Sequence, residues 1–255
     1  MGCVATFNPI TVQKPTGPEL ARLLKDEAVA LVAIMPSKEP AKYKDKVYTY
    51  CTGVFIKADI ILTANHCAEG FVKFTNKSKK DTEKDDDDKE IKVPDNMRLS
   101  YVVASEVYSP GMHPKRIHTA KLIYHNHAQD LALLQIEEDA SLPKHSIATI
   151  AKTNPEVGEV LEMMGNIERQ DFSFRTGVVA AYRETMDFSG AKKLGIQGPF
   201  MQAAALVGPG DSGGGAYNSD GELVGIASFI SGGNAGIVYY VGLSTVQKVA
   251  ATTDK

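Results

Sequence analysis

The stretch Gly208-Pro-Gly-Asp-Ser-Gly-Gly-Gly215 is the most informative segment of this 255-residue chain. Glycines on both sides of Ser212 let the backbone turn tightly, because glycine adopts conformations that are closed to other residues. Such a turn can aim the amide groups of Gly210 and Ser212 at one point beside an exposed hydroxyl, which is how an oxyanion is stabilised. The alternative is a flexible, polar, glycine-rich hairpin, which would not need Asp-Ser at its centre.

A histidine follows an apolar run in Ile61-Leu-Thr-Ala-Asn-His-Cys67, and a second cysteine opens the preceding run Cys51-Thr-Gly-Val-Phe-Ile56. The two cysteines could be tied across a tight hairpin and so fix the loop that presents the His66 ring. They could equally be two buried thiols beside an ordinary imidazole. The segment alone leaves both interpretations open.

An aspartate closes the segment His127-Ala-Gln-Asp130 and precedes the run Leu131 to Ile136, which is apolar apart from Gln135. A carboxylate at the start of a buried strand becomes partly buried and then needs a donor, such as the Nδ1–H group of a histidine. Aspartate is also a common turn residue, so this signal is weak by itself.

Together these three segments resemble the trypsin/chymotrypsin-like (family S1) serine proteases. The sequence TANHC at 63–67 is similar to the family's TAAHC, DLALL at 130–134 to its DIALL, and GDSGG at 210–214 to its nucleophile loop. The order His, Asp, Ser along the chain is the chymotrypsin-type order. The resemblance runs from about residue 28 to 251, and stretches such as Gly165-Asn166 look more like bacterial trypsin-like peptidases than vertebrate ones.

The resemblance implies a role for each matching residue. Ser212 would attack the scissile carbonyl, His66 would take and return the proton, and Asp130 would hold the imidazole and stabilise its cation. The amides of Gly210 and Ser212 would bind the oxyanion. The resemblance therefore implies a serine endopeptidase that works through an acyl-enzyme and needs no cofactor or metal.

The rest of the chain predicts an all-β protein. Short runs rich in Val, Ile, Tyr and Thr are separated by Gly, Pro, Asn and Asp, and no long crossover helices lie between them, which disfavours a parallel α/β sheet. Antiparallel barrels or a sandwich remain. The predicted strands are 28–35, 47–56, 59–63, 100–108, 119–124, 131–136, 158–164, 173–182, 198–206, 222–230 and 236–242. The resemblance resolves these strands into two antiparallel six-stranded β-barrels with the active site between them.

The predicted organisation has three parts. Residues 1–27 form an N-terminal arm with a short amphipathic helix at Glu19–Asp26, residues 28–140 form the first barrel, and residues 141–255 form the second barrel. A C-terminal helix is predicted at Ser244–Ala251.

Charge and hydropathy exclude several classes of function. Lys plus Arg is 28 and Asp plus Glu is 31, a net charge of −3, which disfavours nucleic-acid binding through a broad basic face. The longest apolar run, Ala28 to Met35, has the length of a strand, so no membrane-spanning helix is predicted. We expect polypeptide substrates and a monomer.

One departure from the family concerns activation. In its familiar zymogens, a newly freed N-terminal amine pairs with the aspartate before the nucleophile, here Asp211, but nothing upstream of Val29 offers that amine. We therefore expect Asp211 to have another partner and the site to need no activation cleavage.

Specificity is predicted from the pocket that the resemblance implies. Leu206 aligns with the position that carries an acid in trypsin-like members, and Phe229, Ile230 and Gly236 would form the wall. An apolar pocket leaves a Lys or Arg side chain without a counter-charge. We expect a small or apolar P1 residue, with the substrate backbone lying along Ser228 to Ile230.

Two clusters outside these motifs raise the question of metals. The segment Asn76 to Glu90 has no apolar side chain and several carboxylates, which suit Ca²⁺, but its five lysines favour a solvated loop. Four histidines precede Asp130 and are interpreted as loop residues, because a metal site needs more ligands in a defined geometry. They are His113, His118, His125 and His127.

The cysteines bear on location. Cys51 and Cys67 match the family's disulfide beside the catalytic histidine, which persists in oxidising compartments. Cys3 is left over and is a candidate lipid-anchor site of a trimmed bacterial lipoprotein, whereas Gly2 instead fits N-myristoylation, which implies the cytosol. The disulfide favours a secreted, periplasmic or cell-surface protein, although no secretory signal is present in this chain.

Two other functions fit the same fold. A non-proteolytic binding module could keep the barrels for partner recognition, but such relatives usually lose a member of the triad, and all three residues are present here. An esterase-like hydrolase would share the machinery and differ in the leaving group.

Overall fold

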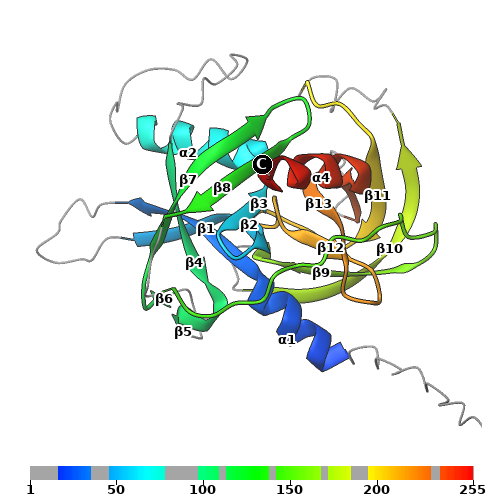
Figure 1. The fold of residues 1–255 in the computed structure, drawn as a ribbon, viewed down its shortest axis with the longest axis horizontal. Helices are drawn as coiled ribbons and strands as arrows, with labels where there is room; N and C mark the ends of the chain where they lie inside the picture. Colours follow the sequence, from blue (N-terminus) through cyan, green and yellow to red (C-terminus); the bar gives the residue numbers. More distant parts are fainter. Residues whose placement is uncertain are drawn as a thin grey trace, which may run out of the picture.

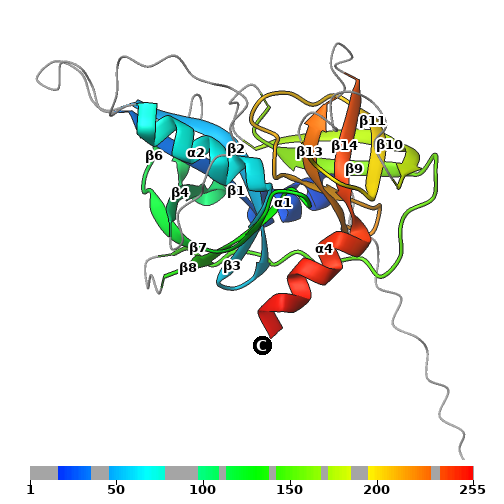
Figure 2. The same cartoon turned by 90° about the horizontal axis from the view of Figure 1, so that it is seen from above.

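Two closed β-barrels make up most of the chain, as Figure 1 shows. The computed structural model describes residues 17–35, 46–77, 97–108, 113–137, 142–167, 172–184, 195–230 and 236–254. Each barrel has six antiparallel strands, and Figure 2 shows the barrels lying side by side. The predicted fold class, including the short C-terminal helix, is confirmed.

The first barrel has the strand order β1-β2-β3-β8-β7-β4 and closes by pairing of β4 with β1. Its interior is filled by alternate apolar side chains such as Val29 and Leu31, which are fully buried with Phe55 and Tyr101. Its strands are β1 (Ala28–Met35), β2 (Lys46–Lys57), β3 (Ile60–Thr63), β4 (Arg98–Val103), β7 (His118–Asn126) and β8 (Leu131–Ile136).

The second barrel has the order β10-β11-β14-β13-β12-β9 and closes by pairing of β9 with β10. Its interior is also apolar and includes Leu161, Met201 and Tyr240. Its strands are β9 (Val160–Gly165), β10 (Ser173–Arg183), β11 (Phe200–Ala205), β12 (Gly215–Tyr217), β13 (Leu223–Ile230) and β14 (Ile237–Gly242). A two-stranded sheet of β5 (Val107–Tyr108) and β6 (His113–Pro114) lies outside the barrels.

The helices lie at the edges of the barrels. They are α1 (Gly17–Glu27), α2 (Asn65–Lys77) and α4 (Leu243–Ala250), with 3₁₀ turns η1 (Ala104–Glu106) and η3 (Ala251–Asp254). Lys57 of the first barrel binds η3, donating to the Thr253 carbonyl at 2.8 Å and to the Asp254 carboxylate at 2.6 Å. None of the helices in the described part of the chain is long and apolar enough to cross a membrane.

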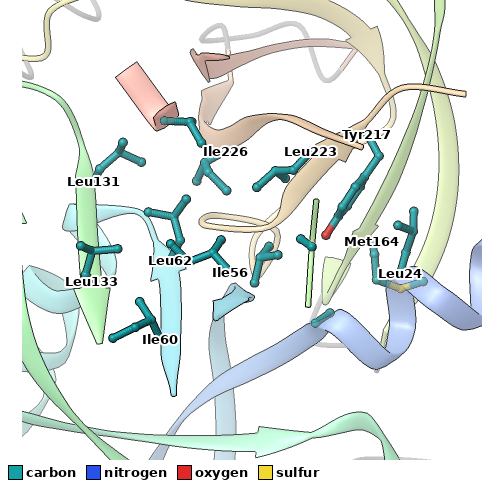
Figure 3. Close-up of a cluster of buried hydrophobic side chains, with 14 of the residues drawn as sticks. Leu24, Ile56, Ile60, Leu62, Leu131, Leu133, Met164, Tyr217, Leu223 and Ile226 are labelled. Atoms are coloured by element: carbon teal, nitrogen blue, oxygen red, sulfur yellow. The ribbon is translucent and has the colours of Figure 1, made fainter. Parts of the chain in front are cut away.

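A third apolar core joins the two barrels. Figure 3 shows Leu62 and Leu131 of the first barrel approaching Leu223 and Ile226 of the second, with Leu24 of α1 at one end. All five side chains are completely buried. Burial of this kind stabilises a fold by about 1.5–3 kcal/mol for each large side chain, so the seam fixes the relative position of the barrels.

Several predictions of local structure were wrong. The predicted strand 100–108 ends at Val103 and continues as η1 and β5, and β12 has only three residues, too short for its pattern to be recognised. Asn76 and Lys77 end helix α2 instead of opening a loop, because Cys67, Ala68 and Phe71 give the segment one apolar face. The rest of the acidic segment, 78–90, lies outside the described residues, as do Gly2 and Cys3.

The interpretation of the four histidines as loop residues was also wrong in part. His118 and His125 lie in β7, and His118 is buried with its Nε2 atom 2.5 Å from the Glu106 carboxylate. His127 lies in the turn after β7, where its Nδ1 atom is 2.8 Å from the Glu69 carboxylate. His113 belongs to β6, and its side chain is outside the described part of the structure.

Candidate active site

Asp130 and His66 meet at the end of the first barrel. Asp130 ends the turn between β7 and β8 with a φ of +50°, a conformation that aspartate tolerates better than most residues, and only 1% of it is exposed. Its carboxylate oxygens lie 3.0 and 3.1 Å from His66 Nδ1 and accept the His66 backbone N–H at 3.0 Å. Ser228 of β13 also donates its hydroxyl to this carboxylate. These hydrogen-bond donors stabilise the negative charge of the buried Asp130 carboxylate.

The electrostatics favour the charged forms of both residues. Burial alone would lower the pKa of His66, but its attraction to Asp130, the hydrogen bond to Asp130 and the charge of Glu69 outweigh burial and raise it above 6.5. Burial alone would raise the pKa of Asp130, whereas His66 and the hydrogen bonds from His66 and Ser228 lower it below 3.8. Asp130 therefore stays ionised and stabilises a proton on His66.

The loop that carries Ser212 lies between β11 and β12. Gly210 and Gly213 have φ angles of +104° and +81°, and a Cβ atom on Gly213 would collide with the Thr52 carbonyl and the Thr63 hydroxyl. A residue with a side chain would therefore be strained at both positions, which is why the loop needs glycine there.

The backbone amides of this loop alternate between bonded and unbonded. Asp211 N–H donates to the Gly208 carbonyl at 3.1 Å, and Gly213 N–H donates to the Ala227 carbonyl at 2.8 Å. Within the described residues, the amides of Gly210 and Ser212 have no hydrogen-bond acceptor. The structure thus leaves the two amides expected to form the oxyanion hole available to a ligand.

The Ser212 loop is seated against the first barrel next to His66. Thr52 N–H of β2 donates to the Ser212 carbonyl at 2.8 Å, and Cys67 Sγ lies 3.6 Å from the same oxygen. Cys51 and Cys67 form a disulfide, which ties β2 to the start of α2, where His66 is the second residue. The sequence segments that carry Ser212, His66 and Asp130 are brought together at the junction of the two barrels.

Asp211 has an internal partner. Arg175 of β10 forms two hydrogen bonds with its carboxylate, Nη1 to Oδ2 and Nη2 to Oδ1, both 2.6 Å long. The Gly208 N–H also donates to Oδ2 at 2.9 Å. Asp211, which precedes Ser212, is thus held by an arginine of the second barrel, in line with the expectation that it has a partner other than an N-terminal amine.

A pocket of about 290 Å³ opens beside Ser212. Its walls are mostly apolar: Val207, Pro209, Ala227, Phe229, Ile230 and Val238 line it together with Gly208, Asp211, Ser212 and Ser228. Phe229 is fixed between Phe200, edge to face at 5.4 Å between ring centroids, and Tyr239, stacked at 5.0 Å. The pocket has the size and lining to accept one side chain of a ligand.

Two residues predicted for this pocket lie elsewhere. Leu206 is 64% exposed and Gly236 is exposed, and neither is among the residues that line the pocket. Val207, the next residue along the chain, is buried and lines the pocket.

Three residues that contact the nucleophile loop, or buttress a contact to it, were not identified from the sequence. They are Thr52, Arg175 and Asn166. The pair Gly165-Asn166 stood out only as a family likeness, and nothing in the pattern around Thr52 or Arg175 indicates a partner more than thirty positions away.

Three side chains with the spacing of metal ligands gather at this junction. Within the described part of the chain, the one group of side chains with the spacing of metal ligands is Cys51, His66 and Cys67. Two of the three sulfur and nitrogen donors are consumed by the disulfide, which leaves a single imidazole. The remaining donor set does not fit a structural metal ion.

Comparisons with known proteins agree with this geometry. Residues 51–226, more than half of the chain, match the family model described as trypsin-like peptidase domain. Among curated proteins, a probable periplasmic serine endoprotease DegP-like from Marinomonas sp. (strain MWYL1) is 31% identical over 140 residues, which cover 54% of this chain and 28% of the relative. The periplasmic pH-dependent serine endoprotease DegQ of Escherichia coli K12 is 32% identical over 134 residues, covering 51% and 28%. These matches span less than a third of each relative.

Solved structures share the fold. The Rv3671c protease from M. tuberculosis in its active form superposes with a TM-score of 0.63 at 14% identity, covering 98% of this chain and 92% of the other. The HtrA-type protease AlgW with a tripeptide gives 0.63 at 19% identity, covering 93% and 63%. With the family match and the arrangement of His66, Asp130 and Ser212, this places the chain in the trypsin-like peptidase family.

Proposed function

We propose that this protein is a serine endopeptidase whose catalytic triad is His66, Asp130 and Ser212. The observation that carries the proposal is the junction of the barrels: a histidine bound to a buried carboxylate on one side, and on the other a serine with two amides that have no acceptor among the described residues. Curated relatives of this chain are named serine endoproteases, which supports the same activity. The chemistry uses only groups of the chain itself, so no cofactor is proposed.

In the proposed mechanism, Ser212 Oγ attacks the carbonyl carbon of the scissile bond while His66 Nε2 takes the hydroxyl proton. The carbonyl oxygen becomes an oxyanion that the Gly210 and Ser212 amides bind. The C–N bond then breaks, the leaving amine receives the proton from His66, and an ester to Ser212 remains. Water attacks this ester by the same route, with His66 as the base, and releases the acid.

Asp130 acts in this mechanism by orienting His66. Because its carboxylate faces Nδ1, the Nδ1 atom of the neutral ring carries the proton and Nε2 is left free to accept one. The same carboxylate stabilises the imidazolium that forms in each step, which the raised pKa of His66 also favours.

The pocket supports a preference for a small or apolar P1 residue. Among the described residues that line it, the one carboxylate is that of Asp211, which is already neutralised by two hydrogen bonds from Arg175. A Lys or Arg side chain in this space would lose its hydration without gaining a free counter-charge. Val207 and Val238, both buried, offer contact surface to an aliphatic side chain instead.

An exported location is proposed on two grounds. The Cys51–Cys67 disulfide is of a kind that persists in oxidising compartments, and the named relatives are periplasmic. Attachment through Cys3 and a monomeric state belong to the same proposal. Cell fractionation of the tagged protein, with and without Cys3→Ala, tests the location and the anchor, and light scattering of the purified protein tests the monomer.

The activity is tested with a fluorophosphonate probe followed by digestion of a peptide library. The wild-type chain should be labelled and should cleave, while Ser212→Ala should do neither, with a loss on the order of 10⁴ to 10⁶ in kcat. Ser219→Ala, which removes an exposed serine from the turn after β12, is the matched control and should behave as wild type. Binding of peptides without labelling or cleavage would instead favour a binding module, and cleavage faster after Arg than after Ala, Val or Leu would refute the P1 proposal.

A further inference from the structure

The side chain of Thr52 links three separate segments of the chain. It lies on β2 of the first barrel and is fully buried. Its hydroxyl donates to the Gly210 carbonyl at 2.8 Å. The same oxygen accepts two hydrogen bonds from Asn166, which follows β9 in the second barrel: one from the backbone N–H at 3.2 Å and one from Nδ2 at 3.0 Å.

The direction of these hydrogen bonds is fixed by the surroundings of Asn166. Its Oδ1 atom accepts the N–H of Phe172 at 3.0 Å, so its Nδ2 must be the atom that faces Thr52. Both Asn166 groups at Thr52 are therefore donors, and the Thr52 hydroxyl has to act as their acceptor. Its single proton is then directed to the Gly210 carbonyl. Asn166 is completely buried, so water does not compete for these bonds.

Thr52 contacts the Ser212 loop at a second point. Its backbone N–H donates to the Ser212 carbonyl at 2.8 Å, so one residue binds the carbonyls of both Gly210 and Ser212. The peptide between Asp211 and Ser212, which supplies the Ser212 N–H, is held between these two contacts. Gly210 also supplies the second amide of the proposed oxyanion hole, its own N–H. The peptide that contains the Gly210 carbonyl lies between the two peptides that contain the Gly210 and Ser212 N–H groups. If this carbonyl tilts, the directions of both N–H groups therefore change.

We propose that Thr52 is a positioning residue for the oxyanion hole, and that Asn166 orients the Thr52 hydroxyl for this task across the barrel junction. The inference rests on the proposed function and deepens it. Thr52 does not touch the substrate; it acts through the Gly210 carbonyl. Preorganised donors lower a barrier because they need not reorient as charge develops on the substrate oxygen. Loss of the hydroxyl therefore affects the chemical step more than substrate binding.

The test is the exchange of Thr52 for valine, which keeps the branched shape and removes the hydroxyl, and for serine, which keeps the hydroxyl. Thr52→Val should lower kcat roughly 10- to 100-fold with KM unchanged, somewhat less than complete removal of an oxyanion donor. Thr52→Ser should retain most of the wild-type kcat. Thr49→Val, another buried threonine of β2, is the matched control and should keep the wild-type kcat even if it lowers the melting temperature.

A second readout separates positioning from general loss of structure. A peptide boronic acid, which forms a tetrahedral adduct with the serine, should bind Thr52→Val more weakly by the same factor that kcat/KM falls. A substrate peptide, which the Ser212→Ala variant does not cleave, should bind with the same affinity to Ser212→Ala and to the double variant Ser212→Ala with Thr52→Val. Should the valine variant fail to fold, Thr52→Ala, which introduces no new apolar group, is measured in its place below its melting temperature.

The outcomes also separate this proposal from the proposed function. Wild-type kcat in folded Thr52→Val or Thr52→Ala overturns the positioning role and leaves the peptidase intact. A rise in KM with unchanged kcat overturns it as well, because that change reports substrate binding. Absence of hydrolysis dependent on Ser212 in the wild-type protein overturns the proposed function itself.

Discussion

Arg175 and Asp211 form a bidentate ion pair beneath the loop that carries Ser212, with both Nη-to-Oδ distances at 2.6 Å. The two side chains are 12% and 7% exposed. Gly165 lies against the pair, and a Cβ atom there would collide with the Asp211 carboxylate. The Asp211 carboxylate is thus paired with a cation of the second barrel, and we expect this pair to hold the loop that carries Ser212.

Replacing Arg175 with alanine should therefore lower both the stability and the activity of the protein. The variant leaves the Asp211 carboxylate buried without its partner, which costs about 3–5 kcal/mol in comparable pairs. Chemical denaturation and active-site titration with the fluorophosphonate probe measure the two effects. Arg98→Ala is the control, because Arg98 and Glu137 pair on the exposed surface, and it should barely change the denaturation midpoint. Full activity of folded Arg175→Ala would contradict this role.

The pH profile of kcat/KM should have its acidic limb above pH 6.5. His66 must be neutral to accept the Ser212 proton, and Asp130 and Glu69 raise its pKa above 6.5 by stabilising the charged ring. Activity should accordingly fall as the pH drops through this raised pKa, from a plateau on the alkaline side. A limb centred below pH 6.5 would show that burial outweighs the two carboxylates.

Glu69→Gln should move that limb toward lower pH. Glu69 Oε1 accepts from Asn65 Nδ2 at 2.7 Å and lies 2.8 Å from His127 Nδ1, which joins the start of α2 to the turn that carries Asp130. Glutamine retains an oxygen for these contacts, so the geometry of His66 is kept. It removes the negative charge, so the protonated His66 ring is less stabilised and the pKa of His66 falls. Glu222→Gln, which removes a carboxylate bonded to Asn218 in the second barrel, should leave the limb in place. An unchanged limb in Glu69→Gln would assign the raised pKa to Asp130 alone.

The elements that sequence patterns predict well are those with a local signal. β1 and β8 begin and end at the predicted residues, because β1 is an uninterrupted apolar run and β8 is apolar apart from Gln135. α1 and α4 differ from the predicted helices by one or two residues at their ends. Helix α2 was missed because Gly70 and the polar residues near its C-terminal end weaken its periodicity, while its apolar face packs on the first barrel.

In the candidate active site, sequence motifs located the residues that we propose to react, but not the residues that hold them in place. Ser212, His66 and Asp130 lie in motifs whose neighbours are constrained by tight turns. Thr52 contacts Asn166 over a separation of 114 residues and Gly210 over 158, so only the packing of the two barrels brings them together. Nothing in the local pattern of β2 distinguishes Thr52 from Thr49, which is buried in the same strand.

Removal of the disulfide should weaken both stability and catalysis. Cys51 and Cys67 are 16 residues apart, and closing a loop of about this length is worth about 3 kcal/mol through the entropy of the unfolded chain. The double variant Cys51→Ala with Cys67→Ala should lower the free energy of unfolding by about that amount. Its kcat should also fall, since the bond ties β2 to the residues around His66. Cys3→Ala is the control for loss of a cysteine, and equal stability of all three proteins would contradict the prediction.

Glu27 is an acid buried at the seam between the barrels, and it makes stability depend on pH. It ends α1 with 2% of its surface exposed, and its Oε2 atom has no hydrogen-bond partner among the described residues. Burial raises the pKa of Glu27 to about 8, a rise that Tyr217 opposes and the nearby Asp26 supports. The folded protein therefore carries a proton on Glu27 at neutral pH.

The sign of the effect follows from proton uptake. Between pH 4.5, near the pKa of an unfolded glutamate, and about 8, the folded state binds this proton and the unfolded state does not. Stability from this group should fall as pH rises across that window, by about 1.4 kcal/mol for each pH unit. Glu27→Gln, which keeps the shape of the protonated acid, should remove this slope and stabilise the protein most near pH 8. Denaturation midpoints measured from pH 5 to 8.5 test this prediction. Glu137→Gln is the control, because Arg98 lowers the pKa of Glu137 and this residue does not titrate in that range. The control should shift the curve of midpoint against pH in parallel. Parallel curves for wild type and Glu27→Gln would mean that Glu27 is ionised in the fold.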